Sequence, residues 1–158
     1  MLIAEIGLNH LGSFIQAEQF VRRLINSNID AITFQIREST YYQQPDKNNL
    51  LLTNDNYVNL CNIIKSHNKK FGIAIGDINK IDFFESINTD FYKVIRNDIT
   101  NKKLIKKLVA TNKKLIVSTG LSSKQEIQEF LEEFGNKNIT LNHTQLSYDI
   151  EDCNLSAI

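Results

Sequence analysis

Short apolar runs alternate with amphipathic stretches along the whole of this 158-residue chain. The short runs are rich in Ile and Val and apolar on both faces, which is typical of parallel strands covered on each side. They lie at 2–6, 31–36, 71–75, 91–95, 115–118 and 139–142. The strict alternation predicts right-handed crossovers and one parallel sheet, because consecutive parallel strands must be joined across a face of the sheet.

The stretches between these runs carry helix signals. Apolar residues recur there at spacings of three and four, which places them on one face of a helix. Ser13 with Gln16, and Ser123 with Glu126, fit capping boxes at two helix starts, and Gly135 predicts the end of the last helix. We therefore expect six strands and five helices, without a linker or domain boundary.

Composition excludes several classes of protein. Hydrophobic residues make up 42% of the chain, which supports a folded core. No apolar run approaches the roughly 18 residues of a membrane span, and the N-terminus does not look like a secretory signal. Lys plus Arg and Asp plus Glu are both 18, so the basic charge expected of a nucleic-acid binder is missing.

The two cysteines, Cys61 and Cys153, are far apart in the sequence and lack a CxxC neighbour. This spacing argues against a disulfide framework and against a zinc site. The simplest interpretation is a cytoplasmic protein with two free thiols, with Cys61 in the core.

Two α/β architectures fit the alternation. One is an open doubly wound sheet, and the other is a TIM-type barrel of parallel (βα) repeats that lacks its last units. The turn after the first run reads Gly-Leu-Asn-His-Leu-Gly at 7–12 and does not match GxGxxG, so a dinucleotide site gets little support. In both folds a ligand binds at the carboxyl ends of the strands. The long irregular segment 37–53 follows the second strand and is of a length typical of functional or mobile loops.

Polar residues gather where that rule places a ligand. The set lies within or just after the apolar runs and comprises Glu5, Gln35, Lys93, Asp98, Ser118, Asn142 and Thr144. A charged group buried alone costs several kcal/mol, so Glu5 and Lys93 require partners or a ligand. A ring with a base, acids and hydroxyl or amide donors suits an anionic substrate that carries phosphate or carboxylate.

Each of these features also has a purely structural interpretation. Glu5 and Lys93 could form a structural ion pair with each other. The Ser118-Thr119-Gly120 sequence is common at turns and helix caps, and His143 is typical of a surface histidine. The residues by themselves leave these alternatives open.

Six segments in order resemble motifs of the sialic acid synthase family. The opening AEIGLNHLGS at 4–13 is similar to AEIGxNHxGS, and DAITFQ at 30–35 is similar to DAVKFQ. YKVIRND at 92–98 resembles YKIxSxD/E, and LIVSTGLSS at 115–123 resembles ILSTGMSS. LNHTQL at 141–146 and CNLSAI at 153–158 resemble LHCTSLYP and VNLxAI. The resemblance runs through the whole chain in register.

The resemblance implies a fold and a reaction. Members of that family fold as a (β/α)8 barrel followed by a small antifreeze-like domain, and they condense phosphoenolpyruvate with an N-acylated hexosamine to form a nonulosonic acid. A divalent cation, manganese or magnesium, polarises the sugar aldehyde in the family. For this chain we expect one domain over 1–158, an incomplete TIM-type barrel of about six strands and five helices, without the antifreeze-like domain.

The resemblance also assigns roles to residues. Glu5 and Asp98 are the expected catalytic groups, and Gln35, Lys93 and Ser118 are the expected phosphoenolpyruvate ligands. The expected sugar-side or rim residues are Asn9, His10, Arg96, Asn142 and Thr144. No metal ligand is assigned, because the family's metal-binding histidines belong to later strands.

The chain departs from the family pattern at several positions. Thr33 replaces a lysine of the second strand, and Asn142 stands where a histidine belongs. An alternative function is therefore an inactive or partner-dependent protein that binds a phosphate ligand or acts through interactions. An incomplete barrel exposes strand edges and apolar surface, so self-association or a complementing polypeptide is expected.

Overall fold

The computed structural model describes residues 1–95, 98–135 and 137–144, and these form alternating strands and helices. The strands are β1 Ile3–Gly7, β2 Ala31–Ile36, β3 Lys70–Ile75, β4 Phe91–Val94, β5 Lys114–Ser118 and β6 Ile139–Asn142. The helices are α1 Phe14–Leu24, α2 Asn54–Ser66, α3 Ile81–Ser86, α4 Lys102–Ala110 and α5 Lys124–Phe134. Short 3-10 turns lie at η1 Tyr41–Gln43, η2 Ile78–Lys80 and η3 Asp98–Thr100. The predicted alternation is confirmed.

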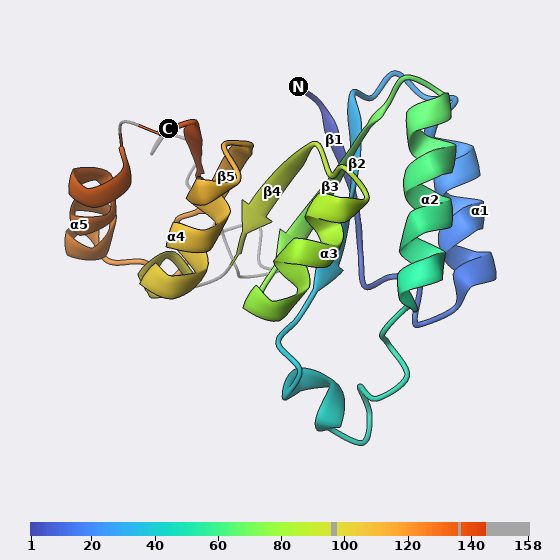
Figure 1. The fold of residues 1–158 in the computed structure, drawn as a ribbon, viewed down its shortest axis with the longest axis horizontal. Helices are drawn as coiled ribbons and strands as arrows, with labels where there is room; N and C mark the ends of the chain where they lie inside the picture. Colours follow the sequence, from blue (N-terminus) through green and yellow to red (C-terminus); the bar gives the residue numbers. More distant parts are fainter. Residues whose placement is uncertain (96–97, 136, 145–158) are drawn as a thin grey trace, which may run out of the picture.

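The strand order decides between the two architectures left open by the sequence. All six described strands are parallel, and they lie side by side in the order β1-β2-β3-β4-β5-β6. A doubly wound sheet reverses direction at a switch point, whereas a barrel adds each strand next to the preceding one. The fold is therefore of the TIM-barrel type with an open sheet. Figure 1 shows α3 and α4 in front of the strands, with α1 and α2 together at one side and α5 at the other.

The two faces of the sheet differ in what covers them. Phe34, Ile73, Tyr92 and Val117 point to the helices and belong to the main hydrophobic core. The opposite face carries a small second cluster of Ala31, Phe91 and Ile116, with Ile3 packed against it. Alternate residues of a strand point to opposite faces. Every second residue of a strand therefore packs against the helices, and the residues between them lie on the opposite face, which we call the inner face.

Gly72 shows how closely side chains pack at the base of the inner face. A β-carbon at this position would lie 2.3 Å from the ring of Phe91 on the neighbouring strand. No side chain fits in that space, so the Phe91 ring lies directly over the β3 backbone. The inner face is therefore closed by an apolar layer at the amino ends of the strands.

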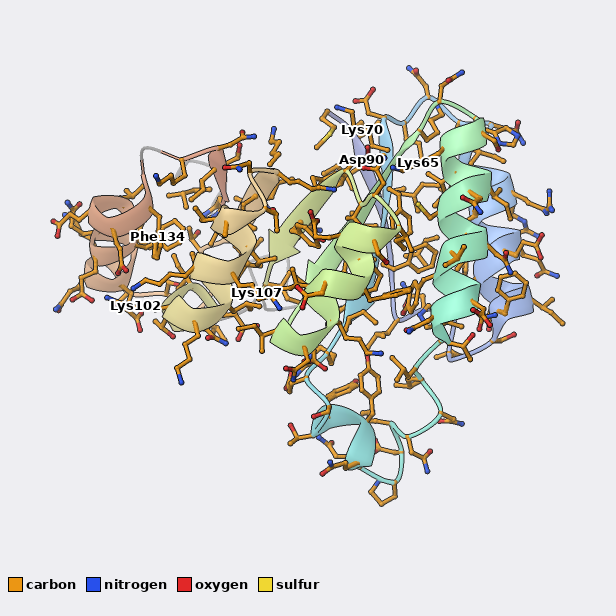
Figure 2. The ribbon with its side chains drawn as sticks, in the orientation of Figure 1. Lys65, Lys70, Asp90, Lys102, Lys107 and Phe134 are labelled. Carbon is orange, nitrogen blue, oxygen red and sulfur yellow. The ribbon has the colours of Figure 1, made fainter. Side chains whose placement is uncertain are left out.

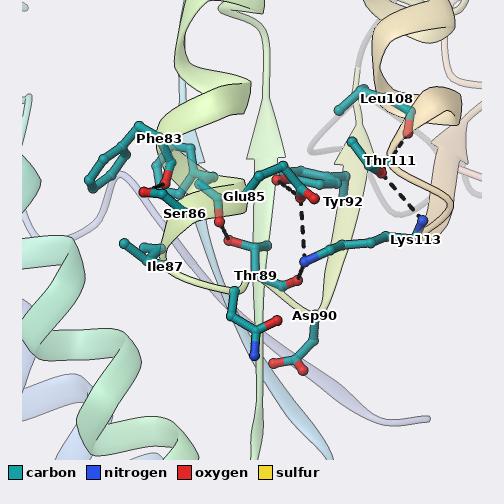
Figure 3. Close-up of polar contacts among 12 residues, drawn as sticks. Phe83, Glu85, Ser86, Ile87, Thr89, Asp90, Tyr92, Leu108, Thr111 and Lys113 are labelled. Carbon is teal, nitrogen blue, oxygen red and sulfur yellow. Dashed lines mark hydrogen bonds and ion pairs between the residues drawn. The ribbon is translucent and has the colours of Figure 1, made fainter.

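A polar network fixes the amino ends of the strands on the helix side (Figure 3). Tyr92 is buried and its hydroxyl donates to Glu85 of α3 at 2.5 Å, while Lys113 lies 3.4 Å from the same carboxylate and donates to the Thr89 carbonyl. At the same end of the strands Lys65 Nζ lies 3.4 Å from Asp90 Oδ2, and the two residues form an ion pair (Figure 2). Polar contacts at this end of the barrel strands serve stability.

Of the two predicted capping boxes, the one at α5 is complete and the one at α1 is half formed. Ser13 accepts from the Gln16 amide at the start of α1, and α5 has the full box of Ser123 with Glu126. Gly135 caps the end of α5 as expected. A further box of Thr53 with Asn56 begins α2. Among the described residues, none of the helices is both long and apolar enough to span a membrane.

Cys61 is a core residue, as the sequence predicts. It is buried in α2, and its thiol donates to the Ile87 carbonyl at 3.5 Å. Burial raises the pKa of the Cys61 thiol to about 11, so the thiol stays protonated and unreactive at neutral pH. Cys153 lies outside the described residues.

Candidate functional site

Lys93 and Glu5 meet on the inner face of the sheet. Lys93 Nζ donates to Glu5 Oε2, although β1 and β4 are separated by two other strands. Three inter-strand spacings amount to about 14 Å in a flat sheet. Contact between the two charged groups therefore requires both long side chains and the curvature of a barrel-type sheet.

Small side chains form the floor beneath this ion pair. In the strand register Glu5 is next to Thr33, Thr33 is next to Gly72, and Ala74 is next to Lys93. Neighbouring residues in a parallel register share a face. Because neither Thr33 nor Ala74 projects far from the sheet, the Lys93 side chain can cross β3 and β2 above them.

Gln35 lies beside the same pair. It is next to Ala74 in the register and therefore points to the inner face. A β-carbon at Gly7 would lie 3.7 Å from Gln35 Oε1 and 3.7 Å from Glu5 Oε1. The two side chains thus flank the Gly7 backbone, and the structure brings Glu5, Gln35 and Lys93 together as the sequence predicts.

A second polar cluster ends β5 and β6. Ser118 is buried, and its Oγ lies 2.5 Å from Thr144 Oγ1. The Gly120 amide donates to Thr144 Oγ1 at 2.9 Å and to Ser118 Oγ at 3.3 Å. Ser122 belongs to the same turn, and its buried hydroxyl has no hydrogen-bond partner among the described residues. The cluster directly precedes the N-terminus of α5, so hydroxyls, a backbone amide and the positive end of a helix dipole meet there.

Register places this second cluster on the same face as the ion pair. Ile116 is next to Lys93, and Ser118 is two residues further toward the carboxyl end of β5. Both clusters therefore occupy the inner face near the carboxyl ends of the strands, the location expected for a ligand.

The predicted rim residues differ in position and exposure. Asn142 ends β6 next to Ser118, is exposed, and its carbonyl accepts from Thr119 N at 3.0 Å. Asn9 is exposed in the turn after β1. Arg96 lies outside the described residues. Asp98 begins η3 after β4 and is half-buried.

The prediction that His10 lies at the rim is wrong, because this residue is fully buried. Its Nδ1 accepts from the Gly12 amide at 3.0 Å, and its ring packs 6.0 Å from Phe34, which points to the helices. The ring is thus part of the folded turn and offers no surface to a ligand. Burial lowers the pKa of His10 to about 4, so the ring is neutral at pH 7.

The long segment 37–53 contains residues to which the sequence analysis assigned no individual role. It extends beyond the carboxyl end of β2 (Figure 1), where the Arg37 guanidinium lies 4.2 Å from the centre of the Tyr41 ring. The Arg37 amide donates to the Tyr42 hydroxyl at 3.0 Å. The length of the loop was the signal for function, but the sequence did not reveal this stacking.

Gly12 fixes that segment to the turn after β1. A β-carbon at Gly12 would lie 1.6 Å from the Asn49 carbonyl oxygen, and its φ of +77° is in the left-handed region. Only glycine allows this approach and this conformation together. The turn that follows Glu5 is therefore packed directly against the end of the segment 37–53.

A family model described as the NeuB family matches residues 16–158. The chain belongs to the NeuB family. It is 32% identical to the uncharacterized protein MJ1065 of Methanocaldococcus jannaschii over 99% of this chain and 50% of that protein. It is 26% identical to N-acetylneuraminate-9-phosphate synthase of Drosophila melanogaster over 99% of this chain and 49% of that protein.

A solved structure supports the membership in three dimensions. The N-acetylneuraminic acid (sialic acid) synthetase from Leptospira borgpetersenii, in complex with citrate, superimposes with a TM-score of 0.89 at 25% identity. The match covers 99% of this chain and 59% of that one. The NeuB-family chain spans about half the length of the curated relatives it matches. The resemblance inferred from the sequence motifs is thus confirmed at the level of the family and the fold.

Proposed function

We propose that this NeuB-family chain binds phosphoenolpyruvate on its inner face and acts in a sialic acid synthase-like condensation with an N-acylated hexosamine. The observation that carries the proposal is the contact between Lys93 and Glu5 beside Gln35, on the same face as the Ser118 and Thr144 hydroxyls. Family membership supports the reaction type.

The donors on this face suit a ligand with two anionic groups. Lys93 supplies a positive charge, and the second cluster supplies the hydroxyls of Ser118, Ser122 and Thr144. Charge-assisted hydrogen bonds to phosphate or carboxylate are about twice as strong as neutral ones. We assign phosphate and carboxylate binding to Lys93, Gln35 and Ser118. Thr144 adds a further hydroxyl beside Ser118 at the carboxyl ends of β5 and β6.

In the proposed reaction C3 of the enolpyruvate attacks the aldehyde carbon of the sugar and forms the new C–C bond. Water then adds at C2, and phosphate leaves from the resulting tetrahedral centre. Glu5 lies closest to Lys93 and is assigned an acid/base or charge-stabilising role at the reacting enolpyruvate. Asp98 follows β4 and is assigned to the sugar side, with Asn142 at the rim. Preorganised donors of this kind stabilise charge as it develops.

The similar synthetase from Leptospira was solved with citrate, a polycarboxylate. A protein of this fold therefore accommodates a ligand with several anionic groups. That finding supports the assignment of an anionic ligand to the chain described here.

The divalent cation implied by the resemblance has no ligand set in the part of the chain that the structure describes. No group of three or more His, Cys, Asp or Glu side chains there could hold a metal ion. A catalytic zinc-type site uses about three protein ligands. The described residues thus do not fit a metal, and the roles assigned above are independent of one.

Calorimetric titration with phosphoenolpyruvate tests the binding step. Lys93→Ala should weaken binding at least tenfold, because it removes the cation of the inner face. Lys114→Ala, at the amino end of β5, should leave the affinity unchanged. Equal effects of the two substitutions would overturn the assignment of the pocket.

A binding protein without turnover is the second candidate. The ion pair between Lys93 and Glu5 carries no net charge. An anionic ligand should therefore bind here more weakly than at a site with a free cation. The two candidates separate in one assay of N-acetylmannosamine and phosphoenolpyruvate with manganese present. Nonulosonic acid and free phosphate indicate the synthase, whereas binding without either product indicates the second candidate.

A further inference from the structure

The two partners of the inner-face ion pair differ in exposure. The Lys93 side chain is 17% exposed, whereas the Glu5 side chain is 41% exposed. Glu5 can therefore turn away toward solvent, while Lys93 is confined between its neighbours on the sheet.

We infer that Glu5 serves as an internal anion that occupies Lys93 in the free protein and must be displaced by a phosphate or carboxylate ligand. This inference deepens the proposed function and rests on it. An incoming anion and the Glu5 carboxylate compete for the same ammonium group, and their like charges repel each other. Glu5 thus lowers the affinity of the inner face for phosphate and carboxylate ligands.

The small side chains of Thr33 and Ala74 make this competition possible. They allow Lys93 to cross from β4 to β1, whereas a bulky residue in the floor would keep Lys93 away from Glu5. The competition is therefore a property of the inner-face register and not of the two charged residues alone.

Glu5→Gln separates the two roles of this residue, because it keeps the shape of the side chain and removes its charge. Phosphoenolpyruvate and inorganic phosphate should each bind the variant about fivefold more tightly, the gain expected when a partly exposed ion pair no longer has to be broken. Glu18→Gln is the matched control. It removes the carboxylate of an exposed pair with Arg22 on α1 and should leave both affinities unchanged.

The rate at which acetic anhydride acetylates Lys93, followed by peptide mass spectrometry, measures how well Glu5 protects Lys93 when no ligand is present. Lys93 should react faster in Glu5→Gln than in the native protein and at the native rate in Glu18→Gln. An unchanged or slower rate in Glu5→Gln overturns the inference.

The titrations distinguish failure of the inference from failure of the proposed function. Native binding with equal or weaker binding by Glu5→Gln overturns the role of Glu5 as an internal anion and leaves the pocket assignment standing. Absence of binding by native protein and variant alike overturns the proposed function.

Discussion

Ser118 Oγ and Thr144 Oγ1 lie 2.5 Å apart, and the Gly120 amide donates to both. The pair joins the end of β5 to the residues after β6, which are 26 positions further along the chain. It therefore fixes the last described strand of the sheet against the turn that begins α5. The cluster has both a structural and a ligand-binding role in our proposal.

Thr144→Val tests both roles, because valine keeps the shape of threonine and removes the hydroxyl. We expect a loss of about 1–2 kcal/mol in the free energy of unfolding, since the Gly120 amide loses an acceptor. Affinity for phosphoenolpyruvate should fall about three- to tenfold. Urea denaturation and calorimetry measure the two effects. Thr140→Val, on the exposed part of β6, is the control, and an equal change there would contradict the prediction.

Gly12→Ala should destabilise the protein by about 2 kcal/mol or more. The left-handed backbone conformation costs about 1 kcal/mol for alanine, and the new methyl group would overlap the Asn49 carbonyl. Chemical denaturation gives the magnitude. Asn49→Ala leaves that carbonyl in place and should change stability by less than about 0.5 kcal/mol. A denaturation midpoint for Gly12→Ala equal to that of the native protein would contradict the close approach of Gly12 to the Asn49 carbonyl.

His10 should make stability depend on pH between about 7 and 5. Its pKa is about 4 in the folded protein and near 6.5 when unfolded, so the unfolded state binds more protons in this range. The stabilisation is present above pH 6.5 and is lost as the pH falls toward 4. We expect a loss of about 2 kcal/mol from pH 7 to pH 5.

His10→Asn provides the comparison, because its amide oxygen can accept from the Gly12 amide but cannot titrate in this range. Thermal or urea unfolding at several pH values should show a flatter profile for this variant. A profile as steep as that of the native protein would mean that other groups cause the pH dependence.

Tyr92→Phe should lower the free energy of unfolding by about 1.5–3 kcal/mol. The hydroxyl donates to the Glu85 carboxylate inside the network of Figure 3, and hydrogen bonds to charged groups contribute in this range. Burial and the Glu85 carboxylate raise the pKa of Tyr92, so the phenol is a donor at neutral pH. Urea denaturation measures the loss.

Lys107→Met is the control for Tyr92. It removes an ion pair with Asp82, whose side chain is 80% exposed, and should cost less than about 0.5 kcal/mol. A larger loss from Lys107→Met than from Tyr92→Phe would show that the network at the amino ends does not stabilise the fold as described.

The sequence by itself determined the elements of this protein and their order. Periodicity located all six described strands to within one residue at each end, because a buried parallel strand is a short apolar run with few alternative interpretations. Six ordered motifs were sufficient to identify the family. The Ser123 and Glu126 capping box was readable because its hydrogen bonds join residues only three positions apart.

Only the tertiary structure decided which polar residues meet. Sequence left open whether Glu5 and Lys93 contact each other; they do so because the curved sheet and the small residues Thr33 and Ala74 bring β1 and β4 within reach. His10 was expected at the rim and is buried, since its position depends on a hydrogen bond to Gly12 and on packing against Phe34. Contacts between residues far apart in the chain depend on sheet curvature and packing volume, and neither is encoded in a local pattern.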